Sequence, residues 1–219
     1  MTIVYIIAVF VVAYLTGSVP TAVWYGKKYH QTDVREHGSG NAGATNTFRV
    51  LGKKAGSIVM AIDVFKGFLA TMLPVIALNL DWFVAFSEPQ FVHIKLFCGI
   101  GAVIGHIFPL YASFKGGKGV ATLLGMVIGI NPIAALGCVA VFLTVFLISK
   151  YVSLSSMISG LAFPLLLLIQ WVFEFSPSSF LRIFGFVIFG LLVFTHRKNI
   201  KRLMNGEENR ANFSLGNNR

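Results

Sequence analysis

The feature that most constrains this chain is a succession of long apolar segments separated by short polar ones. A helix needs about 20 apolar residues to cross a bilayer, where its backbone must satisfy its own hydrogen bonds. Only 12% of the 219 residues are charged and 56% are hydrophobic, whereas about 25% of the residues in soluble domains are charged. We therefore predict an all-α, polytopic integral membrane protein, with a single transmembrane domain over residues 1–219. About seven transmembrane helices are expected, at residues 3–25, 55–79, 91–110, 119–131, 132–149, 155–173 and 180–195.

The basic residues predict how these helices are oriented. If seven helices cross the membrane, three loops and the C-terminal segment share one side, and that side holds most of the Lys and Arg residues. The opposite side holds only Lys95 and Arg182. Because basic loops stay in the cytoplasm, we predict an external N-terminus and a cytoplasmic C-terminus, with residues 205–219 as a flexible tail. The shared side comprises residues 26–54, 111–118, 150–154 and 196–219.

Two glycine-rich loops, residues 38–49 and 114–119, fall on the predicted cytoplasmic side. Glycines allow several backbone N–H groups to converge on an anion, and Lys or Arg adds full charge. The alternatives are a solvated, capped loop for the first and simple topology determinants for the second. The pattern favours binding of a phosphorylated substrate. The candidate residues are Ser39, Gly40, Asn41, Gly43, Ala44, Asn46 and Arg49 in the first loop and Lys115, Gly116, Gly117 and Lys118 in the second.

The spacing Gly38-x-Gly40-x-x-Gly43 formally matches the dinucleotide-binding fingerprint. That fold requires an apolar strand immediately before the glycines, but residues 27–37 are polar. The acidic residue 20 positions later, Asp63, falls inside a predicted span. The dinucleotide-binding (Rossmann) interpretation is therefore rejected.

Asp63 and Lys66 are charged residues inside the second predicted span. Charges within a membrane are costly and are usually paired or functional. Since residues three apart lie on one face of a helix, we expect a mutual ion pair that supports the site structurally. The two cysteines, Cys98 and Cys138, lie in apolar segments and are expected to be core residues without a disulfide.

Polar residues also gather near two later span ends. Ser153, Ser155 and Ser156 open the sixth span, where they can either cap the helix or bind an anion at its N-terminus. His196 and Asn199 follow the seventh span and share a helical face. The chain has no His followed five positions later by Asp, no Asp-rich metal motif and no Gly-x-Ser-x-Gly elbow. Chemistry here must therefore rest on anion binding and positioning.

With these motifs in order, the chain resembles the bacterial acyl-phosphate:glycerol-3-phosphate acyltransferases, the PlsY family. The resemblance covers nearly the whole chain, and its several ordered motifs make it specific. It rests on Gly17-Ser18-Val19-Pro20, Ser39-Gly40-Asn41-x-Gly43-Ala44-x-Asn46-x-x-Arg49, Gly105-His106-x-x-Pro109, Phe114-Lys115-Gly116-Gly117-Lys118-Gly119-Val120-Ala121-Thr122, Tyr151-Val152-Ser153-Leu154-Ser155-Ser156, His196-x-x-Asn199-Ile200-x-Arg202-Leu203 and Gly206-Glu207-Glu208.

The resemblance implies a seven-helix enzyme of the bacterial inner membrane with its active site facing the cytoplasm. It would transfer a fatty acyl group from acyl phosphate to the sn-1 hydroxyl of glycerol 3-phosphate, the first step of phospholipid synthesis, and give lysophosphatidic acid and phosphate. It implies no metal, no cofactor, no nucleic acid and no obligate protein partner. The implied catalytic residues are Lys118, Ser156, His196 and Asn199, with Ser153, Ser155 and the residues of the two loops binding substrate.

Two other classes of protein compete with this interpretation. A carrier of a phosphorylated or anionic solute needs polar groups near the membrane midplane, and only Asp63 and Lys66 qualify. A non-catalytic lipid-binding or scaffold protein does not explain two glycine-rich loops with basic residues.

Overall fold

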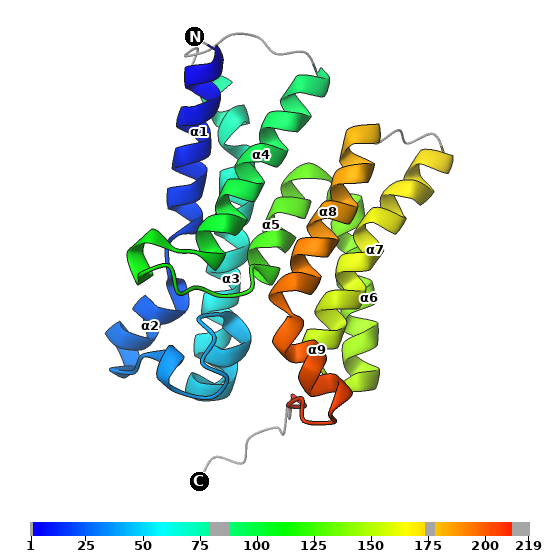
Figure 1. Ribbon diagram of the computed structural model, residues 1–219. Coiled ribbons are helices and arrows are strands. Elements are labelled where there is room, and N and C mark those ends of the chain that lie inside the picture. The colour runs from blue at the N-terminus through cyan, green and yellow to red at the C-terminus, as the bar shows by residue number, and fades with distance from the viewer. Residues whose placement is uncertain (1, 79–87, 174–177, 212–219) are drawn as a thin grey trace. The chain divides into compact units, whose positions relative to one another are not determined.

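The computed structural model describes residues 2–78, 88–173 and 178–211, and within these ranges every regular element is a helix (Figure 1). This confirms the predicted all-α class. The chain forms two compact units, Met1–Pro132 and Ile133–Arg219. Unit 1 contains α1 (Thr2–Gly17), α2 (Thr21–His30), α3 (Ala44–Leu78), α4 (Glu88–Ile107) and α5 (Val120–Ile130), with 3₁₀ turns at Val34–Glu36 and Leu110–Ala112. Unit 2 contains α6 (Pro132–Ser149), α7 (Val152–Val172), α8 (Ser179–Thr195) and α9 (Arg197–Met204).

Five segments of the described chain are long and apolar enough to cross a membrane. A sixth arises if α8 and α9, which are bent by 63° relative to each other, form one span. Helix α5 has 11 residues, or roughly 16 Å at 1.5 Å per residue, against a hydrocarbon core of about 30 Å. An integral membrane protein is therefore confirmed, while the count of seven crossings stays a prediction.

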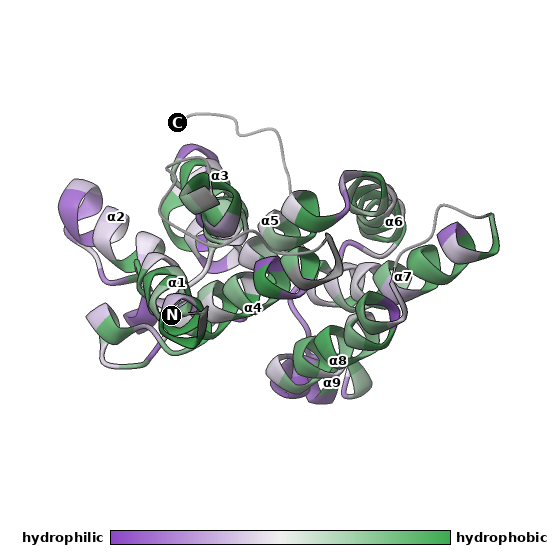
Figure 2. Cartoon of the chain, turned by 90° about the horizontal axis from the view of Figure 1, so that it is seen from above, coloured by the Kyte–Doolittle hydropathy of each residue, from purple (hydrophilic) through white to green (hydrophobic). Residues whose placement is uncertain are grey.

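Large apolar side chains remain exposed on the outer surfaces of the helices, as a lipid environment requires. Ile148, Leu136 and Ile183 are 80%, 72% and 68% exposed. A water-soluble protein rarely leaves such continuous apolar surface uncovered. Figure 2 shows helices that are largely hydrophobic along their length, with hydrophilic residues gathered on α2 and α9.

Two predicted helix boundaries were wrong. The apolar run 3–25 is interrupted after Gly17, because Pro20 has no N–H to donate and disfavours helical geometry in the residue before it. The second span begins at Ala44 instead of residue 55, and Gly52, with φ 86°, marks a kink within it. Part of the predicted first loop is therefore helical.

Glycine allows the helices of unit 1 to approach closely. A Cβ at Gly17 of α1 would overlap the Ala102 carbonyl oxygen of α4, and a Cβ at Gly125 of α5 would overlap the Val64 carbonyl oxygen of α3. Small residues at such contacts are the usual means of packing helices in membranes. Cys98 lies in the core between α1, α3 and α4. Both it and Cys138 are buried free thiols, as predicted.

In unit 2, α7 packs against both of its neighbours. The Ser159 hydroxyl donates to the Cys138 carbonyl of α6 at 2.8 Å, and Gly160 leaves room for Leu192 of α8. The expected flexible tail divides into two parts. Its residues up to 211 are described, and the Ala211 N–H donates to the Lys150 carbonyl at 2.9 Å. Residues 212–219 lie outside the described residues.

Candidate active site

The first loop of unit 1 is ordered by the side chain of Asn46. This amide donates to the carbonyl oxygens of Val34 at 2.7 Å and His37 at 3.1 Å, and its oxygen accepts from the Ser39 N–H at 2.9 Å. Asn46 is 1% exposed. Both amide hydrogens are thus committed within the protein. Asn46 shapes the loop, although the sequence had suggested that it was a donor to the ligand.

The other candidates of the first loop lie around the start of α3. Ser39 and Gly40 are exposed, Asn41 and Ala44 are half-buried, and Gly43 is buried. Arg49 lies on α3 and is exposed. Within residues 2–78, 88–173 and 178–211 it has no ion-pair partner, so its guanidinium is available to an anion.

A neighbouring ion pair holds the segment before this loop. Asp33 accepts from the Arg35 backbone and Nε at 3.0 Å and from its Nη2 at 2.7 Å. The Arg35 hydrogen bond holds the pKa of the Asp33 carboxyl well below its usual range. Arg35 also donates to the Ala112 carbonyl at 3.3 Å, which connects the first loop to the turn preceding the second.

The second loop lies against the C-terminal end of α4. The N–H groups of Gly116 and Gly117 donate to the carbonyl oxygens of Ile107 at 3.2 Å and His106 at 3.1 Å. A Cβ on Gly116 would overlap the His106 carbonyl oxygen, and one on Gly117 would overlap the His106 ring. Both glycines are therefore small because their backbone packs closely against α4. The sequence had instead suggested that they allow close approach of a ligand.

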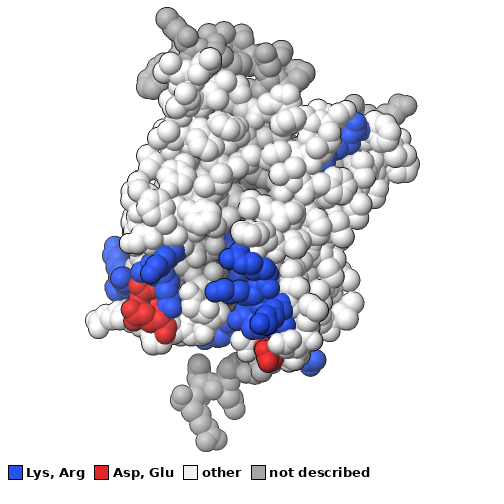
Figure 3. Space-filling model, in the orientation of Figure 1, with Lys and Arg blue, Asp and Glu red and all other residues white. Residues whose placement is uncertain are grey.

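The two loops meet at this point. A Cβ at Gly117 would also lie 3.2 Å from the Ala42 carbonyl oxygen of the first loop. Lys115 is exposed and Lys118 is half-buried. Figure 3 shows basic side chains clustered over the part of unit 1 that carries α2 and these loops. We call the candidate residues of segments 38–49 and 114–119 the loop group.

Unit 2 contains a second group of candidate residues, organised by Glu208. Its Oε1 accepts from the Ser153 hydroxyl at 2.8 Å and the Asn199 amide at 2.7 Å, and its Oε2 accepts from Arg202 Nε at 2.9 Å. Burial acts to raise the pKa of the Glu208 carboxyl, but the hydrogen bonds from Asn199 and Ser153 and the charge of Arg202 prevail, and the pKa lies below its usual value. We call these four residues the carboxylate group.

Sequence reasoning missed the role of Glu208. The residue belongs to the Gly206-Glu207-Glu208 motif, which the family resemblance pointed out without a role. That motif was the available signal, since an isolated Glu in a polar tail has no other distinguishing pattern.

The remaining candidates of unit 2 are buried beside this group. The Ser155 and Ser156 hydroxyls each donate to the carbonyl four residues earlier, Tyr151 and Val152, at 2.8 Å. Their free lone pairs accept, and donation to a ligand requires the hydroxyl to rotate. His196 is 2% exposed, and its Nδ1 lies 2.8 Å from the Leu192 carbonyl. A carbonyl can only accept, so Nδ1 carries the proton and Nε2 is the basic nitrogen of the neutral ring.

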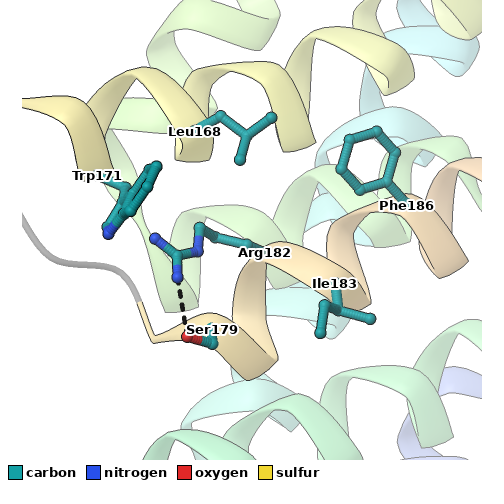
Figure 4. A pocket seen from close by; sticks show the side chains of 6 residues that line it. All are labelled: Leu168, Trp171, Ser179, Arg182, Ile183 and Phe186. Atoms are coloured by element: carbon teal, nitrogen blue, oxygen red, sulfur yellow. Dashed lines mark hydrogen bonds between the residues drawn. The ribbon is translucent and has the colours of Figure 1, made fainter.

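A separate pocket of about 280 Å³ lies along α7 and α8 (Figure 4). Arg182 crosses it, with its guanidinium 4.5 Å from the Trp171 ring and a 2.8 Å hydrogen bond to Ser179. The other lining residues are Leu168, Ile183 and Phe186. None of the candidate site residues lines this pocket.

Comparison with known proteins places the chain in a family. Residues 7–206 match the glycerol-3-phosphate acyltransferase family. The glycerol-3-phosphate acyltransferase of Chlorobaculum tepidum is 42% identical, over 96% of this chain and 98% of the relative. That of Chlorobaculum parvum is 42% identical over 94% and 97%.

Two solved structures are also similar. A crystal structure of PlsY (YgiH), an integral membrane glycerol 3-phosphate acyltransferase, in its glycerol 3-phosphate form has a TM-score of 0.79 and 35% identity over 95% of this chain and 96% of that chain. Its lysophosphatidic acid form has a TM-score of 0.78 and 34% identity over the same shares of the two chains. With a family match over nearly its whole length, this chain belongs to the integral membrane glycerol-3-phosphate acyltransferase family.

Proposed function

We propose that this protein transfers a fatty acyl group from acyl phosphate to the sn-1 hydroxyl of glycerol 3-phosphate, giving lysophosphatidic acid and inorganic phosphate. The observation that carries the proposal is the similarity to PlsY in forms named for glycerol 3-phosphate and for lysophosphatidic acid. The first is the acceptor of the proposed reaction and the second is its product. Acyl phosphate as the donor follows from the family resemblance and from the anion-binding character of the loop group.

The proposed chemistry needs no strong protein nucleophile. Acyl phosphate is a mixed anhydride, and the sn-1 oxygen attacks its acyl carbon directly. The new ester bond forms as the bond from the acyl carbon to the phosphate oxygen breaks, and phosphate leaves. The hydroxyl proton passes to a phosphate oxygen, so the protein needs no dedicated base. The protein contributes by holding two anions close together and neutralising the charge that develops on the carbonyl oxygen.

We assign the residue roles on this basis. Arg49 is exposed without an ion-pair partner in the described chain, and a guanidinium binds phosphate in a fork. Lys118, in the second loop of the same group, binds phosphate and stabilises the developing oxyanion. The Ser39 hydroxyl, the Asn41 amide, the Lys115 ammonium and the N–H groups of Gly43 and Ala44 complete the anion-binding surface. The N–H groups of Gly40, Gly116 and Gly117 donate within the protein, so these three residues shape the two loops.

The second group of candidates serves the same reaction. Asn199 and Ser153 are held by a carboxylate, and this fixes the side chains that would orient glycerol 3-phosphate. His196 has a basic Nε2 on the evidence of its Nδ1 contact, and with Ser155 and Ser156 it adds polar contacts to the substrates. Asn46 contributes indirectly, through the shape of the first loop.

The membrane arrangement is also part of the proposal. Seven helices cross the bacterial inner membrane, α5 being a short crossing, with the N-terminus outside and the C-terminus in the cytoplasm. The concentration of Lys and Arg in the loops and C-terminal segment supports this orientation. Both groups of site residues then face the cytoplasm, where glycerol 3-phosphate is available, and the acyl chain enters from the lipid.

The test is phosphate release by the purified protein in lipid, given palmitoyl phosphate and glycerol 3-phosphate without metal or coenzyme A. We expect release that depends on glycerol 3-phosphate. Lys118→Ala should lower the rate by about 10²–10³-fold, the usual cost of losing one donor to an oxyanion. Lys54→Ala removes an exposed lysine outside the motifs and should leave the rate unchanged.

Absence of release from folded protein would contradict the proposal. The experiment must also distinguish an acyltransferase from a carrier of a phosphorylated solute. Uptake of glycerol 3-phosphate into protein-containing vesicles, without phosphate release, would identify a carrier.

A further inference from the structure

The proposed reaction leaves unexplained a group of buried polar residues in unit 1. Asp63 and Lys66 lie on α3, with side chains only 2% and 6% exposed, and Lys66 Nζ is 2.8 Å from Asp63 Oδ1. This confirms the ion pair predicted from their spacing. Burying two charges costs more than burying an apolar pair of similar volume. A role in packing alone therefore does not account for them.

The ion pair reaches two other segments near the break between α1 and α2. Asp63 Oδ1 accepts from the Thr21 hydroxyl at 2.9 Å, and Lys66 Nζ donates to the Val19 carbonyl at 2.9 Å. Thr21 begins α2, and Val19 lies in the break. The break leaves some backbone groups without helical partners, and Lys66 provides a hydrogen-bond partner for one of them, the Val19 carbonyl.

His106 connects the same ion pair to the second loop. Its Nδ1 lies 3.7 Å from Asp63 Oδ1, and the residue is 6% exposed. On its other side, the ring packs against Gly117, where a Cβ would overlap Nε2, and its carbonyl accepts from the Gly117 N–H at 3.1 Å. His106 therefore spans from the buried carboxylate to the residue directly before Lys118.

We infer that Asp63 is a positioning residue for acyl transfer, which acts through His106 to fix the backbone of Gly116, Gly117 and Lys118, while Lys66 balances its charge. This inference rests on the proposed function. The Asp63 carboxylate contacts Thr21 at the break on one side and His106 on the other. The His106 ring in turn determines how closely the second loop packs against α4. Asp63 contacts no substrate in this account. Its effect is to hold Lys118 where the phosphate and the developing oxyanion require it.

The main test is the double variant Asp63→Asn with Lys66→Gln. Both replacements keep polar atoms near Thr21 and Val19, while the pair becomes neutral and no single charge is left buried. The variant should fold, with a melting temperature close to that of the wild type. A displacement of Lys118 by about 1 Å costs about 10²-fold in rate. The kcat/KM per folded protein should therefore fall by about this factor. The KM for palmitoyl phosphate or for glycerol 3-phosphate should rise by about tenfold or more.

A second variant keeps the ion pair and removes only the connection. His106→Leu conserves approximate volume and leaves the backbone hydrogen bond from Gly117 possible. His106→Leu should raise the KM for the same substrate as the double variant does. His106→Gln, which restores a polar group toward Asp63, should recover part of the lost kcat/KM. Cys98→Ala is the matched control, because Cys98 is fully buried in the same helix, away from the loop. It should lower the melting temperature without changing either KM.

The outcomes separate this inference from the proposed function. If the wild-type protein releases no phosphate, the proposed function fails. If the wild type is active and both variants keep wild-type KM values, losing activity only in proportion to unfolded protein, the positioning role is overturned. It is equally overturned if neither variant folds, because the buried residues then maintain the fold as a whole.

Discussion

The loop group of unit 1 and the carboxylate group of unit 2 achieve order by different physical means. In the loop group, backbone N–H groups and the Asn46 amide set the geometry, and glycines leave space for the His106 ring. In the carboxylate group, one negative charge on Glu208 collects three side chains. The first arrangement should therefore be sensitive to added volume, and the second to loss of charge. Variants of matched size and charge can test this contrast.

Among the variants that test this contrast, the largest effect is expected from Gly117→Ala. The added methyl group overlaps the His106 ring, so the second loop must move away from α4 and displace Lys118. We expect kcat/KM for phosphate release to fall by about 10²-fold, as for a misplacement of about 1 Å. Gly190→Ala is the control, because a Cβ there has no neighbour within 4 Å. Wild-type activity in Gly117→Ala would remove the argument that volume limits the loop group.

A smaller effect is expected from Glu208→Gln. The amide conserves size and can still accept from Ser153 or Asn199, but the negative charge facing Arg202 is lost. A hydrogen bond to a charged group contributes about 1.5–3 kcal/mol, which is about 10- to 150-fold. The amide keeps part of this interaction, so the rate should fall by about tenfold, near the lower end of that range. The adjacent Glu207→Gln removes the same charge from an exposed residue and should keep the wild-type rate. Equal losses in the two variants would show that net charge, and not the carboxylate group, is responsible.

The amide of Asn46 should matter mainly for stability. Asn46→Ala removes three hydrogen bonds, each contributing about 1 kcal/mol, from a residue that is 1% exposed. We expect a destabilisation of about 3 kcal/mol, seen as a lower melting temperature, together with faster proteolysis of residues 34–43. The neighbouring Thr45→Ala, at an exposed position, should melt like the wild type. An unchanged melting temperature in Asn46→Ala would contradict the role of this side chain in ordering the loop.

The smallest effect concerns Asp33 and its pH dependence. The Arg35 hydrogen bond lowers the pKa of the folded carboxyl, so the pair stabilises the protein above the unfolded pKa, near 3.9. This contribution is lost as the pH falls through the lower folded pKa. Asp33→Asn should destabilise the protein by about 1–2 kcal/mol at pH 7, and the difference in melting temperature should shrink below about pH 4. A difference in melting temperature between the wild type and Asp33→Asn that grows on acidification would contradict this prediction.

The sequence predicted the features that hydropathy and helical spacing determine. Helix α8 begins at Ser179 and ends at Thr195, one residue from the predicted start and at the predicted end, because its apolar run ends sharply. The ion pair of Asp63 and Lys66 followed from their i,i+3 spacing. The buried, unpaired cysteines followed from their apolar surroundings.

Other features depend on contacts that hydropathy does not encode. Helix α3 starts at Ala44, within a polar stretch, after a loop that is ordered by Asn46, and no apolar periodicity marks that start. Gly116 and Gly117 looked like a ligand-binding backbone, and their approach to His106 required the path of α4 to be known. Glu208 is 55 positions from Ser153 along the chain, so only folding brings them together.

The most direct test of the central claim is to measure lysophosphatidic acid and inorganic phosphate together, in one reaction of the wild-type protein with palmitoyl phosphate and glycerol 3-phosphate. We expect one 1-acyl lysophosphatidic acid for each phosphate released, and no phosphate when glycerol 3-phosphate is omitted. Phosphate release without lysophosphatidic acid would instead indicate hydrolysis of the donor, and would contradict acyl transfer as the function of this protein.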